Sequence, residues 1–257
     1  MRFVRFKKGE LISYGLWEGD LIRLLKGSPF ESYEISAKTL PLSSAKLLPP
    51  CLPSKIVAVG LNNRSHAEEM KVSPAEEPLI FLKPPSATIG PGDEIVYPKM
   101  SKRVDFEGEV GVVIKKTTRF VSVANALDVI LGYTCFNDVT ARDLQAKDVQ
   151  FTRGKGFDTF APMGPCIQTD LDHRKIKLET YLNGELKQSC ITDDMIYSIP
   201  ELICFISKVM TLLPGDVIAT GTSSGVGPMQ PGDRVEIVIE NIGTLSNKVV
   251  KLEETDW

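Results

Sequence analysis

Three acidic residues at alternate positions in a valine-rich segment have the chemistry of a cation site. They are Asp105, Glu107 and Glu109, and successive side chains of a β-strand point to opposite faces. The three carboxylates would share one face and repel one another unless water or a cation relieves the charge. A solvated strand face is one explanation, but the apolar run after Glu109 indicates a buried strand. Such a face suits Mg²⁺ or Mn²⁺ first and Ca²⁺ as an alternative, and Gly108 leaves room for close approach beside the carboxylates.

Another carboxylate, Asp138, lies where an apolar segment gives way to a predicted helix. Capping that helix is its ordinary role, and binding the metal is the alternative. Arg142 and Gln145 follow at i+4 and i+7, which predicts that the three side chains share one helix face. Beside a metal, the arginine and glutamine suit a substrate's carboxylate and keto oxygen. On an ordinary helix they would be solvated.

His66 and Glu69 stand three residues apart on a predicted short helix. At that spacing a carboxylate can orient an imidazole, as a general base requires. A surface histidine near an acid is the alternative for so short a motif. Glu68, on the other side of the helix, is predicted to be solvated.

Two further polar residues lie in glycine-rich loops. Lys155 stands between Gly154 and Gly156, in backbone that can approach a ligand closely, and it could stabilise an enolate or be only a loop charge. Thr222 lies in the segment 221–227, which lacks a Walker lysine and a following helical pattern, so a nucleotide-phosphate site is disfavoured. Backbone N–H groups and the Thr222 hydroxyl are instead predicted to bind an anionic substrate.

Apolar periodicity predicts the elements that must position these residues. Residues 2–6 and 11–16 alternate as a hairpin does, and residues 40–53, with four prolines, indicate a connector. Further strands are predicted at 56–61, 79–82, 104–115, 131–136, 176–182, 217–220 and 234–240, helices at 64–71, 139–147 and 199–210, and Pro-Gly-Asp turns at 90–93, 213–216 and 230–233. Because strands outnumber helices without regular βαβ alternation, we expect a mainly β protein with some α (α+β) and mixed sheets.

Composition limits the partners and the compartment. The 257 residues carry a net charge of −3, without the basic surplus of a nucleic-acid-binding protein. No apolar run reaches the length of a membrane span, and the amino-terminal segment lacks a signal-peptide core. The five scattered cysteines then predict reduced thiols and a cytoplasmic location. With only two histidines, any metal site must depend on oxygen ligands.

Taken in order, these motifs resemble the fumarylacetoacetate hydrolase family. The resemblance covers roughly residues 54–250 in six blocks: NNRSH at 62–66, FLKPPS at 81–86, DFEGE at 105–109, GY at 132–133 with DVTARDLQ at 138–145, KGFDTF at 155–160, and GTSSGVG at 221–227.

The resemblance implies a site and a fold. The family's metal ligands correspond to Glu107, Glu109 and Asp138, and its usual cation is Mg²⁺. His66 and Glu69 match the pair that activates water in shorter members. Positions that contact substrate in relatives correspond to Arg142, Gln145, Lys155 and Thr222, joined by Thr159. The implied fold is a β-sandwich roll at 53–257, preceded by a small amino-terminal β domain and connector at 1–52, in a homodimer.

The resemblance also implies a reaction on a small oxo-acid. Family members share a metal that chelates an α-keto acid and stabilises the enolate left after bond cleavage. We expect hydrolysis of a carbon–carbon bond in an acylpyruvate-like or fumarylpyruvate-like β-diketo acid. The alternatives within the family are oxaloacetate decarboxylation and 2-hydroxyhepta-2,4-diene-1,7-dioate isomerisation or decarboxylation. A non-catalytic metal-binding protein is the alternative of another class.

Overall fold

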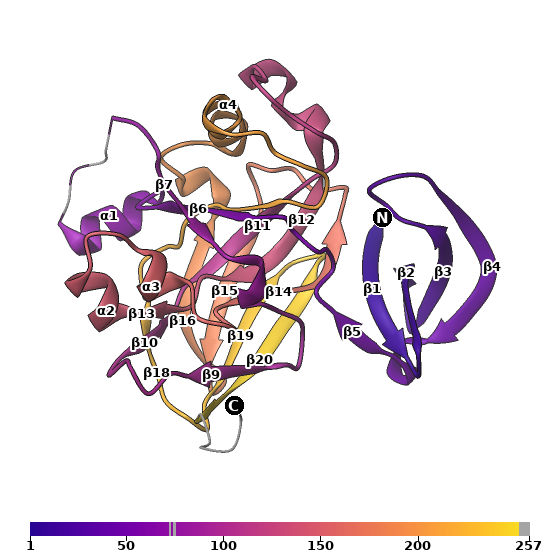
Figure 1. Cartoon of the computed structure of the whole chain (residues 1–257), viewed down its shortest axis with the longest axis horizontal. Helices are drawn as coiled ribbons and strands as arrows, with labels where there is room; N and C mark the ends of the chain where they lie inside the picture. The colour runs from indigo at the N-terminus through magenta and orange to yellow at the C-terminus, as the bar shows by residue number, and fades with distance from the viewer. Residues whose placement is uncertain (72, 74–75, 252–257) are drawn as a thin grey trace.

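The computed structural model describes residues 1–71, 73 and 76–251 and shows a mainly β protein with short helices, as predicted (Figure 1). The strands are β1 (Arg2–Lys8), β2 (Leu11–Glu18), β3 (Leu21–Gly27), β4 (Tyr33–Pro41), β5 (Lys46–Leu48), β6 (Ile56–Gly60), β7 (Leu79–Lys83), β8 (Thr88–Ile89), β9 (Glu94–Tyr97), β10 (Val104–Phe106), β11 (Gly108–Ile114), β12 (Ile130–Asn137), β13 (Thr140–Ala141), β14 (Ala161–Gln168), β15 (Lys177–Leu182), β16 (Glu185–Ile191), β17 (Val217–Ala219), β18 (Gly227–Met229), β19 (Arg234–Ile239) and β20 (Gly243–Lys251). The α-helices are α1 (Arg64–Met70), α2 (Arg142–Lys147), α3 (Thr152–Lys155) and α4 (Ile199–Val209), and short 3-10 helices span Leu42–Ser44, Pro85–Ala87, Val123–Val129 and Thr192–Asp194.

The strands form three sheets. The largest runs in the order β4-β3-β2-β1-β14-β12-β11-β17-β6-β7, with β5 paired to β1 and β8 to β14. A five-stranded sheet has the order β16-β15-β19-β20-β9, and a small one has the order β13-β10-β18. The amino-terminal strands β1–β4 form the part on the right of Figure 1, joined to the rest through β1 and β14.

The core lies between the large sheet and the five-stranded sheet. Val110 and Val112 of β11 belong to one buried apolar cluster with Leu178, Ile237 and Leu245 of the facing strands. Burying each such side chain contributes about 1.5–3 kcal/mol. The central strand β11 is therefore held on both edges and on one face, a rigid support for the residues at its start.

The turn predictions are confirmed. In each Pro-Gly-Asp segment the aspartate N–H donates to the carbonyl three residues earlier, over 3.0–3.3 Å. The aspartate carboxylate also accepts a hydrogen bond from the first residue's N–H in all three turns. Each glycine has a positive φ, between 78° and 104°, which glycine adopts without strain.

Some element predictions are wrong. The segment 40–53 is not only a connector, because β5 lies in it and pairs with β1. The helix predicted at 139–147 begins only at Arg142, since Thr140 and Ala141 pair with β10 instead. Other predicted helices occur at α1 and at α4, where Ser198 and Glu201 form a capping box. The domain division at 52/53 stays a prediction, and residues 252–257 lie outside the described chain.

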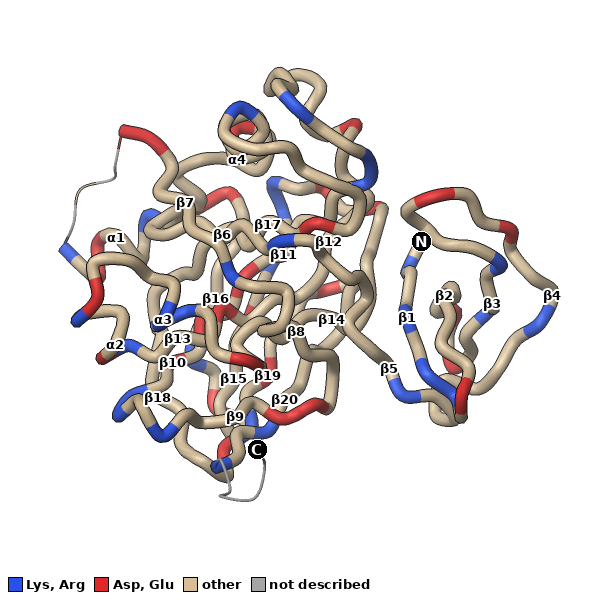
Figure 2. The backbone as a smooth tube through the Cα atoms, in the orientation of Figure 1, with Lys and Arg blue, Asp and Glu red and all other residues tan. Residues whose placement is uncertain are grey.

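The predicted absence of nucleic-acid and membrane partners stays a prediction. Lys and Arg are interspersed with Asp and Glu along the described backbone (Figure 2). No helix in the described part of the chain is long and apolar enough to span a membrane; α4, with 11 residues, is far shorter than a span.

Candidate active site

The acidic segment changes sheets at Glu107. Before it, β10 pairs with β13 and β18; after it, β11 pairs with β12 and β17. At the break, Glu107 N–H donates to Asn137 Oδ1 (3.0 Å), and Asp138 N–H donates to the Glu107 carbonyl (2.9 Å). These bonds bring Asp138, at the end of β12, beside the two glutamates of the neighbouring strand.

Glu107, Glu109 and Asp138 form a buried acid cluster. Their side chains offer oxygens that all lie within 4.8 Å of one another. The residues are only 5%, 2% and 1% exposed, so a solvated acidic strand face is the wrong explanation. Helix capping is also wrong for Asp138, because α2 begins four residues later and no side chain caps it.

Two buried lysines hold this cluster. Lys155 Nζ lies 2.7 Å from Glu107 Oε2 and 2.7 Å from Asp138 Oδ2. Lys83 Nζ lies 2.5 Å from Asp138 Oδ1 and 3.1 Å from the Val139 carbonyl. Lys83 is not among the predicted site residues, although a lysine directly after the apolar segment 79–82 is a signal that could have identified it.

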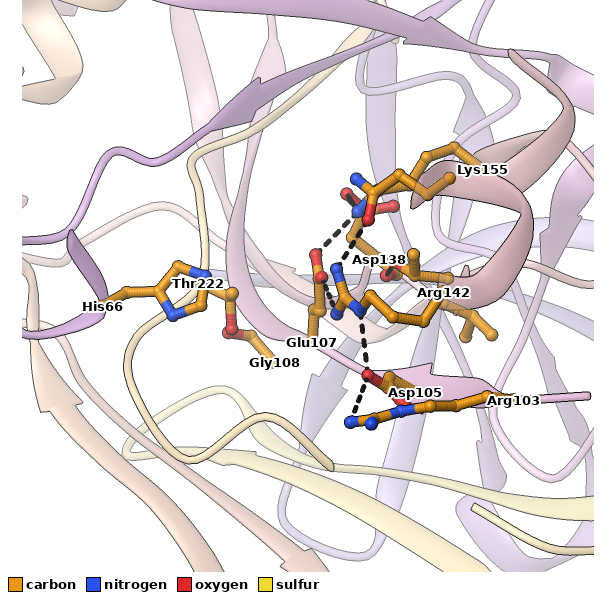
Figure 3. A network of polar contacts seen from close by, with 12 residues as sticks. His66, Arg103, Asp105, Glu107, Gly108, Asp138, Arg142, Lys155 and Thr222 are labelled. Carbon is orange, nitrogen blue, oxygen red and sulfur yellow. Dashed lines mark hydrogen bonds and ion pairs between the residues drawn. The ribbon is translucent and has the colours of Figure 1, made fainter. Parts of the chain in front are cut away.

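Arg142 reaches the cluster from α2. It donates to Glu107 Oε1 (2.5 Å), to Asp105 Oδ2 (2.9 Å) and to Gln145 Oε1 (2.7 Å). Arg103 donates to the other side of Asp105, which is fully buried (Figure 3). Asp105 therefore orients Arg142. Gln145 lies beside Arg142 as predicted, but Asp138 precedes the helix and does not share its face.

Burial and charge shift the acidities within the cluster. Burial alone would raise the pKa of Glu107, but the cations of Lys155 and Arg142 lower it to about 2. Burial raises the pKa of Glu109 well above its usual range, and the charges of Asp138 and Glu107 raise it further. Glu109 thus holds its proton to a higher pH than an ordinary glutamate does.

These residues fit a divalent cation. Carboxylate oxygens are the donors that Mg²⁺ and Mn²⁺ prefer. The positive charges of Lys155 and Arg142 offset the negative charge of Glu107. The Glu109 carboxylate has a single hydrogen-bond donor among the described residues, the Gly221 N–H, which lies 2.9 Å from Oε2. A cation bound there would replace the proton of Glu109, so Glu107, Glu109 and Asp138 could hold a metal together.

His66 and Glu69 meet on α1. His66 Nδ1 lies 3.1 Å from Glu69 Oε2, and Gly225 N–H donates to Glu69 Oε1 (3.2 Å). His66 is only 7% exposed, so it is not the surface histidine of the alternative explanation. With Nδ1–H donating to Glu69, the other ring nitrogen is left as a proton acceptor.

Thr222 lies beside Gly108 in Figure 3, and its hydroxyl is already engaged. Thr222 Oγ1 donates to the Gly108 carbonyl (3.0 Å) and accepts from Gln188 Nε2 (2.8 Å). The prediction that Gly108 leaves space beside the carboxylates is wrong. The space left by its missing side chain is filled by residues of β15 and β16, on the opposite face of the strand. A Cβ there would lie 2.1 Å from Thr180 Oγ1.

The predicted site residues converge on one cavity of about 330 Å³. Its polar wall consists of His66, Glu107, Glu109, Asp138, Arg142, Gln145, Lys155 and Thr222. Its apolar wall consists of Val59, Leu61, Met70, Leu79, Phe81, Ala146 and Phe151. Glu69 stands behind His66. Thr159 is not part of the lining; its Oγ1 accepts a hydrogen bond from Val96 N–H (2.9 Å), and its φ is +69°.

Comparison with family models gives two matches. Residues 55–250 match the model described as fumarylacetoacetate (FAA) hydrolase C-terminal, and residues 1–50 match the model described as Rv2993c-like, N-terminal. Among similar proteins, one from Archaeoglobus fulgidus is 53% identical over 87% of this chain and 88% of its own. The oxaloacetate tautomerase YisK of Bacillus subtilis is 44% identical over 84% of this chain and 77% of its own.

Solved structures give the same architecture. A 2-hydroxyhepta-2,4-diene-1,7-dioate isomerase from Mycobacterium marinum has a TM-score of 0.92 and 43% identity, covering 99% of this chain and 100% of its own. A maleylpyruvate hydrolase from Sphingobium, in complex with manganese(II) and pyruvate, has a TM-score of 0.83 and 31% identity, covering 98% and 100%.

Proposed function

Because the chain belongs to the fumarylacetoacetate hydrolase family, we propose that it is a divalent-metal-dependent hydrolase that cleaves a carbon–carbon bond in an acylpyruvate-like β-diketo acid. The observation that carries the proposal is that the acid cluster and His66 line the same cavity. A structural cation would have no use for an oriented imidazole and an arginine beside it.

The cation would be held by Glu107, Glu109 and Asp138, and when bound would supply positive charge next to the carboxylate and keto oxygens of the substrate. Mg²⁺ and Mn²⁺ are the first candidates. The manganese of the maleylpyruvate hydrolase, 31% identical to this chain, supports the second.

The residues around the cation would transfer the proton of the attacking water and provide positive charge for the substrate. His66, oriented by Glu69, takes a proton from water, and the hydroxide oxygen bonds to the distal keto carbon of the substrate. The bond from that carbon to the central methylene then breaks, and its electron pair forms the pyruvate enolate. The proton on His66 passes to the methylene carbon, which yields pyruvate and a carboxylic acid. Lys155 adds positive charge for the enolate, and Arg142 with Gln145 orients the substrate.

The apolar wall favours an acyl group over a second carboxylate at the distal end of the substrate. Leu79, Phe81 and Phe151 line that wall. Among the described residues, the lining has two cationic side chains, Lys155 and Arg142, and each already contacts a carboxylate of the protein. A second substrate carboxylate would therefore meet apolar side chains, whereas an alkyl group would be desolvated favourably.

The test is to compare parent and His66→Ala on acetylpyruvate and oxaloacetate, each with Mg²⁺ and with Mn²⁺. We expect the parent to cleave acetylpyruvate and the variant to lose this activity. Acetylpyruvate cleavage retained by the variant would rule out the mechanism. If no substrate turns over and EDTA only lowers the melting temperature, the cation is structural and the protein is a binding protein.

A second candidate reaction is keto–enol tautomerisation of oxaloacetate, favoured by the 44% identity to the tautomerase YisK. His66 would then move a proton between the substrate carbon and the enol oxygen, without water. Decarboxylation and dienedioate isomerisation also remain alternatives within the family. Following the ultraviolet absorbance of enol-oxaloacetate in the same experiment separates tautomerisation from hydrolysis. The homodimer stays a proposal from the resemblance, to be checked by light scattering.

A further inference from the structure

Gln188 is a buried amide on β16 that joins two segments of the active site. It is 1% exposed and does not line the cavity. Its Oε1 accepts from Gly108 N–H (2.9 Å), between the two glutamates of the acid cluster. Its Nε2 donates to Thr222 Oγ1 (2.8 Å) and to the Ser223 carbonyl (3.0 Å), in the loop after β17. One side chain thus connects the metal side of the cavity to the substrate side.

Two glycines allow this close approach. A Cβ on Gly108 would lie 3.1 Å from Gln188 Oε1, and one on Gly225 would lie 2.1 Å from the Lys187 carbonyl. Real Cβ atoms do not tolerate the second distance, and Gly225 also has a positive φ of 91°. Strand β16 therefore packs directly on both segments.

The hydrogen bonds of Gln188 determine the polarity of the Thr222 hydroxyl. A backbone N–H can only donate and a backbone carbonyl can only accept, so the amide is fixed with Oε1 toward Gly108 and Nε2 toward Ser223. Thr222 Oγ1 must then accept from Nε2, and its own proton goes to the Gly108 carbonyl. The Thr222 hydroxyl has then used its proton and one of its two lone pairs, so it can only accept one more hydrogen bond.

We infer that Gln188 is a positioning residue that ties Glu107 and Glu109 to the substrate loop and presents Thr222 Oγ1 to the cavity as a hydrogen-bond acceptor. Such an acceptor suits an O–H group, either the enol of the substrate or the water that His66 activates, and it opposes a carboxylate oxygen. The role in turnover rests on the proposed function. The role in holding the two glutamates does not.

The test compares Gln188→Met, Thr222→Val and their double variant in two measurements. The first is Mn²⁺ affinity by calorimetry, and the second is kcat/KM on acetylpyruvate. Gln188→Met should weaken Mn²⁺ binding by about tenfold or more, as loss of an outer hydrogen-bond partner does. It should also lower kcat/KM. Thr222→Val should lower kcat/KM and should weaken Mn²⁺ binding less than Gln188→Met does, since it removes one hydrogen bond to Gly108 and leaves that of Gln188 in place. Adding it to Gln188→Met should cause little further loss of kcat/KM.

Two more variants exclude a merely structural effect. Gln188→Glu keeps the acceptor for Gly108 N–H and loses the donors to Thr222 and Ser223, so it should turn over like Thr222→Val. Its added negative charge attracts a cation, so it should bind Mn²⁺ no more weakly than the parent. If Gln188→Met does not fold, the turnover of Gln188→Glu compared with that of Thr222→Val tests the inference in its place. Asn247→Leu is the matched control, because Asn247 is an equally buried amide that donates to the Gly90 and Asp93 carbonyls. It should lower stability without changing either measurement.

Parental Mn²⁺ affinity in Gln188→Met would overturn the inference, and so would kinetic losses that add fully in the double variant. If the parent binds Mn²⁺ but does not cleave acetylpyruvate, the proposed reaction fails, and the Mn²⁺ affinities alone decide the role of Gln188. A parent that binds no Mn²⁺ would overturn both proposals.

Discussion

The ammonium of Lys83 lies 2.5 Å from Oδ1 of Asp138, and both residues are 1% exposed. The opposite oxygen of the same carboxylate contacts Lys155. Asp138 is thus held from two sides by cations that solvent does not reach. Burial lowers the pKa of Lys83, which has one carboxylate partner. For Lys155, burial is outweighed by two carboxylates, Asp138 and Glu107, and its pKa is raised.

Lys83→Met should destabilise the metal-free protein strongly, because it leaves Asp138 Oδ1 buried without its partner. Breaking one side of a buried ion pair costs about 3–5 kcal/mol. Urea unfolding in EDTA measures the loss. Lys26→Met is the control, since its ion pair with Glu34 spans 3.4 Å between side chains that are 75% and 78% exposed. Exposed pairs contribute about 0–1 kcal/mol. Similar losses in the two variants would contradict the importance of the Lys83–Asp138 pair.

Glu69→Gln should lower kcat by about tenfold to a hundredfold while the fold stays intact, because an amide orients His66 but no longer stabilises its protonated form. Glu68→Gln is the matched control, an exposed neighbour on the same helix. Turnover of acetylpyruvate under saturating Mg²⁺ is the measurement. If both variants keep parental kcat, the charge of Glu69 does not stabilise the protonated form of His66 during turnover.

Glu109→Gln should abolish activity and yet leave the metal-free protein as stable as the parent or slightly more so, because the neutral amide replaces a group whose ionised form burial and the charges of Asp138 and Glu107 disfavour. Thermal melting with EDTA and with millimolar Mg²⁺ tests both parts of the expectation. The Mg²⁺-induced rise in melting temperature should be lost in Glu109→Gln and kept in Glu94→Gln, a change at an exposed strand glutamate. Equal Mg²⁺ shifts in all three proteins would show that Glu109 is not a ligand.

The raised pKa of Glu109 also predicts a pH dependence in the metal-free protein. Below the usual value of 4.5, folded and unfolded chains both carry the proton. As pH rises from there through the raised folded pKa, the unfolded chain ionises first and the folded state loses stability. In EDTA, the stability of Glu109→Gln relative to the parent should therefore grow with pH over this window. A difference independent of pH would mean that folding leaves the pKa of Glu109 unchanged.

Leu79→Arg should shift the substrate preference toward diacids. Leu79 lines the apolar wall and is 44% exposed, so a guanidinium there could meet a distal carboxylate. We expect the ratio of kcat/KM for fumarylpyruvate over acetylpyruvate to rise by roughly fivefold, equivalent to about 1 kcal/mol for a partly exposed charge pair. Leu82→Arg on the same strand, at a position 48% exposed that is not part of the lining, should leave the ratio unchanged. An equal shift in both variants would indicate long-range charge alone.

Sequence patterns predicted the carboxylates better than their surroundings. The alternation at Asp105, Glu107 and Glu109 predicted one shared face of a single strand at 104–115. That strand prediction is wrong, because the strand breaks at Glu107 into β10 and β11, and of the three carboxylates only Glu107 and Glu109 belong to the acid cluster. The partners of those carboxylates depend on distant strands. Lys83 reaches Asp138 over 55 positions, and Gln188 reaches Gly108 over 80. No local pattern encodes such contacts.

Several strands were not predicted. Five of them, β3, β4, β14, β16 and β20, have seven to nine residues, so length alone does not explain the omissions. The short elements were missed for a reason related to long-range contacts. β5 and β13, with three and two residues, carry too little periodicity to be seen, and they form because neighbouring strands supply hydrogen-bond partners. The predicted start of helix α2 was wrong for the same reason, because Thr140 and Ala141 pair with β10 instead of joining the helix. Thr159 was assigned from the family motif alone, and its hydroxyl hydrogen bonds to β9 instead of facing the cavity.

The contacts that close the acid cluster join residues 30, 55 and 112 positions apart. Long-range closures of this kind form late in folding, because their entropic cost must be met before the contacts are made. On the ribosome, the cluster is incomplete until the segment through Gly221 has emerged, since that residue supplies the N–H bound to Glu109. The divalent cation proposed for this site would therefore meet three fully positioned ligands only on a nearly completed chain, and it would bind after most of the fold has formed.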